Sequence, residues 1–171
     1  MNAIMTWEEL TDYAYFFPKI VVTGNQRSGT TYAAYALATE LNYTHVDEMR
    51  FKAHNFDLFK QLLKDTTVVQ APALLHRLPE LNLSNTLVVF MTRDSTDIIK
   101  SMNKSGWLGR ESAREYLKYS TDPLTDILQL IDIKNQFIEQ IPHIKLPYTE
   151  LQKTPGYVHD RSQFTEKQIH G

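Results

Sequence analysis

The eight residues from Gly24 to Thr31 constrain this chain more than any other segment. They read Gly-Asn-Gln-Arg-Ser-Gly-Thr-Thr and stand between an apolar, β-branched run at 19–23 and an alanine-rich run at 29–41. The first run has the composition of a buried strand, and the second that of a helix. A glycine-rich turn between a strand and a helix presents backbone N–H groups and the positive end of the helix dipole to an anion. The segment therefore predicts a phosphate-binding loop.

The loop has the glycine spacing of a Walker A motif but not its lysine. Thr30 occupies the lysine position, and a different cation, Arg27, lies three residues earlier, inside the loop. A Walker lysine reaches the β- and γ-phosphates of a triphosphate, so its absence disfavours NTP hydrolysis. An arginine can instead hold two oxygens of one anionic group. The residues expected to bind the anion are Asn25, Gln26, Arg27, Ser28, Gly29, Thr30 and Thr31. The alternative is a tight turn whose arginine is only a surface charge.

Strands and helices are expected to alternate along the chain. Residue patterns predict further strands at 44–46, 66–70, 86–92 and 143–147, and helices at 7–17, 55–64, 94–103 and 122–141. Such alternation favours an α/β fold of the P-loop type, with three layers and a central, mostly parallel sheet flanked by helices. Ligands of such sheets bind at the carboxyl ends of the strands. Residues 1–171 are expected to form a single domain of this kind.

A second candidate anion site follows the strand predicted at 86–92. Arg93 comes at its carboxyl end, and Ser101 lies eight residues later, a little over two turns along the next helix. A helix that packs across the strand end brings the serine hydroxyl back toward Arg93, and the two side chains then clamp an anion. In the alternative, Arg93 pairs locally with Asp94 or Asp97 and Ser101 only packs.

Together these two motifs resemble those of the sulfotransferase family, over about residues 19–103. The resemblance implies that the loop at 24–31 holds the 5′-phosphosulfate of 3′-phosphoadenosine-5′-phosphosulfate (PAPS), while Arg93 and Ser101 hold its 3′-phosphate. The product would be adenosine 3′,5′-bisphosphate (PAP). Residues 143–151 also resemble the late strand and Tyr-Glu-x-Leu segment of the family. The Arg-Lys-Gly segment of the family has only two loose counterparts, Arg161 and Lys167.

The resemblance also implies a chemistry. Arg27 would be catalytic, stabilising charge on the leaving oxygen, and a general base would take the proton of the acceptor. Within the family this base is a His or a Glu, and Glu48 resembles the Glu-bearing segment of the tyrosyl-protein branch. Alternatives are His76, His54, or a Glu48 that merely pairs with Arg50. Because a sulfuryl group carries a single charge, and no His pair has ligand spacing, we expect no metal.

The composition of the chain limits the possible partners and the possible nucleophiles. The chain has 18 Lys and Arg against 20 Asp and Glu, a net charge of −2, and no Cys. This balance gives no bulk signal for nucleic acid, and the absence of Cys excludes a thiolate nucleophile. No apolar run reaches the roughly 18 residues of a membrane span, and the N-terminal segment, with Glu8, Glu9 and Asp12 and no basic residues, is not expected to be a signal peptide, so we expect a cytoplasmic protein.

Several functions remain open. The main hypothesis is sulfuryl transfer from PAPS to an unknown hydroxyl or amine acceptor. Gln70 to Pro72 either line the acceptor pocket or simply end a strand at Pro72, and the loop at 106–110 either covers the site or packs Trp107 into the core. The chain is shorter than most family members, so its acceptor-binding part is either reduced or completed by another subunit in a homo-oligomer. The alternatives are a non-catalytic nucleotide-binding domain derived from this fold and a small P-loop kinase that uses ATP and Mg²⁺.

Overall fold

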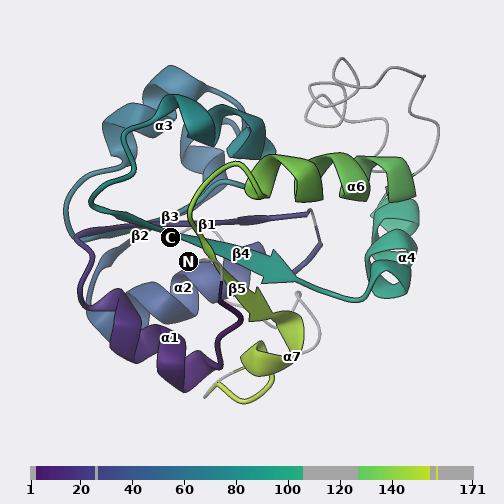
Figure 1. Ribbon diagram of the computed structural model, residues 1–171, viewed down its shortest axis with the longest axis horizontal. Helices are drawn as coiled ribbons and strands as arrows, with labels where there is room; N and C mark the ends of the chain where they lie inside the picture. The colour runs from purple at the N-terminus through teal and green to yellow at the C-terminus, as the bar shows by residue number, and fades with distance from the viewer. Residues whose placement is uncertain (1–2, 26, 106–126, 155–156, 158–171) are drawn as a thin grey trace.

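A five-stranded parallel sheet, in the strand order β2-β3-β1-β4-β5, forms the centre of the molecule (Figure 1). The computed structural model describes residues 3–25, 27–105, 127–154 and 157. The strands are Lys19–Gly24 (β1), Thr44–Val46 (β2), Thr67–Gln70 (β3), Thr86–Thr92 (β4) and Ile144–Pro147 (β5). The α-helices are Trp7–Ala14 (α1), Thr30–Leu41 (α2), Phe56–Leu62 (α3), Ser95–Ser105 (α4), Ile127–Ile138 (α6) and Tyr148–Leu151 (α7), and the 3₁₀ helices are Glu48–Phe51 (η1) and Pro72–Glu80 (η2).

Helices cover both faces of the sheet, so the strands are apolar on both sides. Along β1, Val21 joins the core beneath η1, α3, η2, α4 and α6, whereas Ile20 and Val22 join the core beneath α1, α2 and α7. Figure 1 shows these two helical layers on opposite sides of the sheet. The predicted three-layer α/β fold with a parallel sheet is confirmed. Burial on both faces explains why its strands read as continuous apolar runs rather than alternating ones.

The element boundaries depart from the sequence patterns where proline intervenes. The helical pattern extends to Ile141, but α6 ends at Ile138, and Gln140 and Ile141 continue in a turn. Because Pro142 disfavours the α conformation in the residue before it, the helix ends early. The segment after β3 forms the 3₁₀ helix η2, which contains Pro79.

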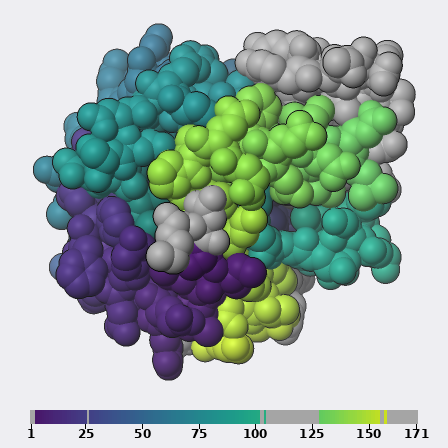
Figure 2. All heavy atoms as spheres, viewed as in Figure 1, coloured from purple at the N-terminus to yellow at the C-terminus, as the bar shows by residue number. Residues whose placement is uncertain are grey.

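The carboxyl ends of the strands meet at one edge, which α4 and α6 flank. The two helices lie together at one side of the molecule (Figure 1, Figure 2). The loop from β1 to α2, the end of β4 and the start of η2 all lie at this edge. None of the helices in the described ranges is long and apolar enough to cross a bilayer.

A buried histidine on β2 gives the fold an expected weakness in acid. His45 is 9% exposed and packs edge-on against Tyr35, and neither of its ring nitrogens has a hydrogen-bond partner among the described residues. Burial lowers its pKa to about 4. Between pH 6.5 and 4 the unfolded chain therefore binds a proton that the folded chain does not, and folding stability falls as the pH falls.

We expect His45→Leu to remove this loss. Urea unfolding at pH 7 and pH 5 should show that the wild type loses about 2 kcal/mol more stability than the variant. His54→Gln, at a half-buried histidine in the turn before α3, is the matched control and should behave like the wild type. Equal losses in the wild type and in His45→Leu would contradict the assignment.

Candidate functional site

Two glycines set the shape of the loop between β1 and α2. Gly24 has a φ of +149°, and a Cβ at this position would lie 2.9 Å from both the Met91 carbonyl oxygen and Ser28 Oγ. Gly29, the N-cap of α2, has a φ of +91°, and a Cβ there would lie 2.8 Å from the side chains of Leu151 and Tyr148. Only glycine tolerates such backbone angles and approaches without strain. The glycine spacing in the sequence therefore has a direct steric cause.

The interior of the loop closes on itself. Ser28 donates from both its backbone N–H and its hydroxyl to the carbonyl oxygen of Asn25. Asn25, Ser28 and Thr30 are buried, and Thr31 is half-buried. Because Gly29 caps α2, the first N–H groups of that helix have no intrahelical acceptor. The loop thus has the closed backbone and helix N-terminus that an anion requires.

Arg27 takes an unusual backbone conformation inside this loop. Its φ is +67°, in the left-handed region that non-glycine residues rarely occupy. Such strain costs on the order of 1–3 kcal/mol and tends to accumulate at functional sites. Its half-buried side chain donates from Nε to Ser101 Oγ on α4, at 2.7 Å. The loop arginine therefore reaches across to the helix that follows β4.

Arg93, directly after β4, completes the cluster. Its Nη1 donates to the carbonyl oxygen of Arg27 at 2.7 Å, and its guanidinium lies 4.2 Å from the ring centre of Tyr148. Its Nε is buried and has no hydrogen-bond partner among the described residues. Its contacts are thus with Arg27 and Tyr148 rather than with Asp94 or Asp97. A buried, unsatisfied N–H of a cation is the group that a bound anion would satisfy.

The two anion sites expected from the sequence lie in contact with each other. The separate clamp predicted for Arg93 and Ser101 instead shares Arg27 with the phosphate loop, because the Arg27 side chain donates to Ser101 and the Arg27 carbonyl oxygen accepts from Arg93. Asp94 caps this helix by accepting from the backbone N–H of Thr96 at 2.8 Å. One continuous cationic cluster, which we call the arginine cluster (Arg27, Arg93 and Ser101), therefore borders the loop.

Gln70, at the end of β3, links the loop to Glu48. Its side-chain nitrogen donates to the hydroxyls of Thr30 and Thr31 at 2.9 and 3.1 Å, and its oxygen accepts from the backbone N–H of Glu48 at 3.2 Å. Glu48 begins η1, and one oxygen of its half-buried carboxylate is buried. In the structure Gln70 bridges the loop and Glu48, and its place in an acceptor pocket stays a prediction.

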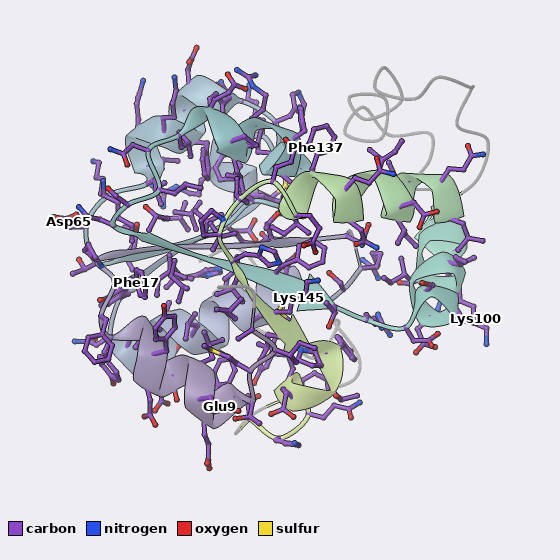
Figure 3. All side chains as sticks on the ribbon, viewed as in Figure 1. Glu9, Phe17, Asp65, Lys100, Phe137 and Lys145 are labelled. Atoms are coloured by element: carbon purple, nitrogen blue, oxygen red, sulfur yellow. The ribbon has the colours of Figure 1, made fainter. Side chains whose placement is uncertain are left out.

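The two histidines weighed as alternatives to Glu48 lie elsewhere. His76, on η2, is 8% exposed and packs edge-on against Phe137 of α6, which Figure 3 labels beside η2. His54 lies half-buried in the turn between η1 and α3. Glu48 is joined to the phosphate loop through Gln70, which accepts from its backbone N–H and donates to Thr30 and Thr31.

Sequence reasoning missed one residue of this region, Lys134. It is fully buried, and its Nζ donates to the carbonyl oxygens of Pro72 at 3.0 Å and Gly24 at 3.3 Å. Burial lowers its pKa to about 7, while the charge of Glu48 acts in the opposite direction. The sequence did contain a sign that Lys134 is buried. It lies four residues after Leu130 and four before Ile138, on the apolar stripe of its helix.

Some predicted residues lie outside the described ranges. These are Gln26 in the loop, the covering loop at 106–110, the helix start at Asp122 and Pro123, and the loose counterparts Arg161 and Lys167.

Comparisons with known proteins bear on the fold. No family matches the sequence, and no curated protein is significantly similar to it. Among solved structures, the chain is similar to a shikimate kinase from Acinetobacter baumannii in complex with shikimate. The sequence identity is 14%, the TM-score is 0.52, and the alignment covers 79% of this chain and 86% of the other. The chain has the P-loop fold. The comparison gives no specific support to the sulfotransferase family.

Proposed function

We propose that this chain binds PAPS and transfers its sulfuryl group to a hydroxyl or amine acceptor. The observation that carries the proposal is the arginine cluster, in which Arg27 of the loop, Arg93 after β4 and Ser101 of α4 converge. The unsatisfied Nε of Arg93 supports an anion-binding role for this residue next to the loop. A nucleotide with anionic groups at both its 5′ and 3′ ends matches two adjacent cations on two different elements. The missing Walker lysine, replaced by Thr30, is consistent with this choice.

The site residues would divide the reaction among them. The loop N–H groups and Arg27 hold the 5′ end and stabilise negative charge on the bridging oxygen as its bond to sulfur breaks. Arg93 and Ser101 hold the 3′-phosphate. Glu48 accepts the proton of the acceptor while the acceptor oxygen or nitrogen forms its bond to sulfur, and PAP leaves. Each charge-assisted hydrogen bond contributes about 1.5–3 kcal/mol.

A P-loop kinase is the second candidate, and the similarity to a shikimate kinase favours it over sulfuryl transfer when the fold comparison is taken alone. Thr31 has the position of the Walker Ser/Thr that contacts Mg²⁺. In that case the arginine cluster would bind an anionic phosphoryl acceptor, and ATP with Mg²⁺ would occupy the loop. The residue after the second glycine of the loop disfavours a kinase, because it is Thr30 and not the lysine of a Walker A motif.

Thermal unfolding with PAP in the absence of metal, beside ATP with Mg²⁺, tests the two candidates. At a hundredfold excess over its dissociation constant a ligand adds about 2.7 kcal/mol, which for a chain of this size raises the midpoint by roughly 5–10 °C. We expect this rise with PAP, and its loss in Arg93→Ala. The matched control is Arg77→Ala, since Arg77 pairs with Glu80 on the exposed side of η2.

Each other result has a definite meaning. A rise only with ATP and Mg²⁺ would replace the sulfotransferase proposal with the kinase. No rise with either ligand would favour the non-catalytic domain. A rise with PAP that survives in Arg93→Ala would remove the role assigned to that arginine.

A further inference from the structure

Lys134 lies in the protein core, where burial of a charged ammonium is energetically unfavourable. It is 0% exposed, on the face of α6 that packs on the core with Leu130, Ile131 and Ile138. Lysine is almost never fully buried unless its ammonium is compensated, because removing the charge from water is unfavourable. An apolar residue of similar length would fill the same space without that penalty. The position of the ammonium therefore requires a reason other than packing.

The hydrogen bonds of Lys134 join two strand ends. Gly24 is the last residue of β1 and the first of the phosphate loop, and Pro72 begins η2 just after β3. These strands are parallel neighbours in the sheet, paired as Val22 with Gln70 near their carboxyl ends. By donating to the carbonyl oxygens of both Gly24 and Pro72, the ammonium holds the start of the loop against the segment after β3.

The same ammonium interacts electrostatically with Glu48. Glu48 is also joined to the far end of the loop, because Gln70 accepts from its backbone and donates to Thr30 and Thr31. Lys134 and Gln70 thus connect Glu48 to both ends of the loop, one through a charge and the other through hydrogen bonds. Neither group needs to reach solvent to do this.

We propose that Lys134 is a positioning residue that holds the phosphate loop and Glu48 in a fixed relation to each other. The role of Glu48 in this statement rests on the proposed function. The anchoring of the loop does not, because any anion bound there depends on where Gly24 is held. The competing explanation is that Lys134 only fills the space under α6.

Lys134→Met separates the two explanations, because methionine keeps most of the length of the side chain and removes the ammonium. Ile131→Val on the same helix is the matched control, since it trims a core side chain that is 4% exposed. Amide hydrogen exchange over residues 19–31 reports how firmly the loop is held. We expect about tenfold faster exchange there in Lys134→Met, the effect of losing one charge-assisted anchor. Ile131→Val should leave the loop unchanged relative to the rest of the molecule.

Two further measurements on Lys134→Met, ligand affinity and the pH dependence of turnover, test the positioning role independently. We expect Lys134→Met to weaken PAP binding about tenfold. We also expect it to move the acid limb of the pH–rate profile to higher pH, because removal of a positive charge makes a carboxylate easier to protonate. A space-filling lysine would produce neither effect.

The pH dependence of stability checks that the ammonium is buried in solution. Since the folded protein holds the pKa of Lys134 near 7 and the unfolded chain keeps the usual value near 10.5, the unfolded chain binds the extra proton between these values. The wild type should therefore gain stability relative to Lys134→Met as the pH rises from 7 to 9.

The outcomes distinguish this inference from the proposed function. Loop exchange in Lys134→Met equal to that of the wild type would overturn the anchoring role, whatever the protein binds. A wild type that binds no PAP would overturn the proposed function but leave the exchange experiment decisive. A wild type that binds PAP, with a variant whose affinity lies within about twofold of it, would also overturn the positioning role.

Discussion

Replacement of Arg27 by alanine is expected to reduce kcat for sulfuryl transfer by about 100- to 1000-fold, the usual effect of removing one donor from a developing negative charge. Arg27 is the cation inside the loop, and its Nε already contacts Ser101 of the arginine cluster. The chain should still fold, because the side chain is half-buried and lies at the edge of the sheet. Single-turnover assays with PAPS, together with thermal midpoints, measure both effects.

Two further variants sharpen the Arg27 experiment. Lys100 precedes Ser101 on α4 and points away from the body of the molecule (Figure 3), so Lys100→Ala should keep wild-type turnover. Arg27→Gly removes the same side chain as Arg27→Ala but relieves the left-handed backbone at φ +67°. It should be about 1 kcal/mol more stable than Arg27→Ala and equally inactive. Turnover of Arg27→Ala within about threefold of the wild type would remove Arg27 from the chemistry.

Gly29→Ala is expected to lower the free energy of unfolding by about 2–4 kcal/mol and to abolish anion binding at the loop. The φ of +91° disfavours any side chain, and the new Cβ would lie 2.8 Å from both Leu151 and Tyr148. Relief of this overlap requires the side chains of Leu151 and Tyr148 or the start of α2 to shift, and a shift of α2 would move the loop N–H groups. For a chain of this size the midpoint should fall by roughly 5–15 °C.

Asn42→Ala is the matched control for Gly29→Ala. Asn42 follows the other end of α2 and has a φ of +57°, but it is exposed. This variant therefore introduces the cost of a left-handed alanine without a steric overlap, about 1 kcal/mol. Urea unfolding and PAP binding of both variants give the comparison. A Gly29→Ala protein that melts within about 2 °C of the wild type would show that the loop tolerates the Cβ.

The sequence predicted most of the architecture because local residue patterns dictate it. The β-branched runs at 19–23 and 86–92 became β1 and β4, two of the three inner strands of the sheet, and 44–46 became β2. A run that is apolar on every residue can be a strand only if both faces are covered, and this requirement implies helices on both sides. Likewise, the glycines at 24 and 29 predicted a strand–loop–helix turn, since positive φ values favour glycine.

Contacts between distant residues had no comparable local signal. Arg27 and Ser101 are separated by 74 positions, and Lys134 and Gly24 by 110. The sequence placed Arg93 and Ser101 in a clamp of their own, and only the hydrogen bonds of the folded chain showed that Arg27 joins them. The positive φ of Arg27 could not be predicted from the sequence either, because the surrounding loop imposes it.

The sequence by itself determined the layers, the strand ends and the loop, because backbone preference and hydrophobic periodicity act over a few residues. Only the tertiary structure decided which charged groups face one another at the carboxyl edge of the sheet. A buried charge is tolerated only where several elements supply partners at once, and those partners become neighbours only when the chain has folded. Lys134 is the clearest case, since its acceptors are Gly24, at the end of β1, and Pro72, just after β3, and both lie far from α6 in the sequence.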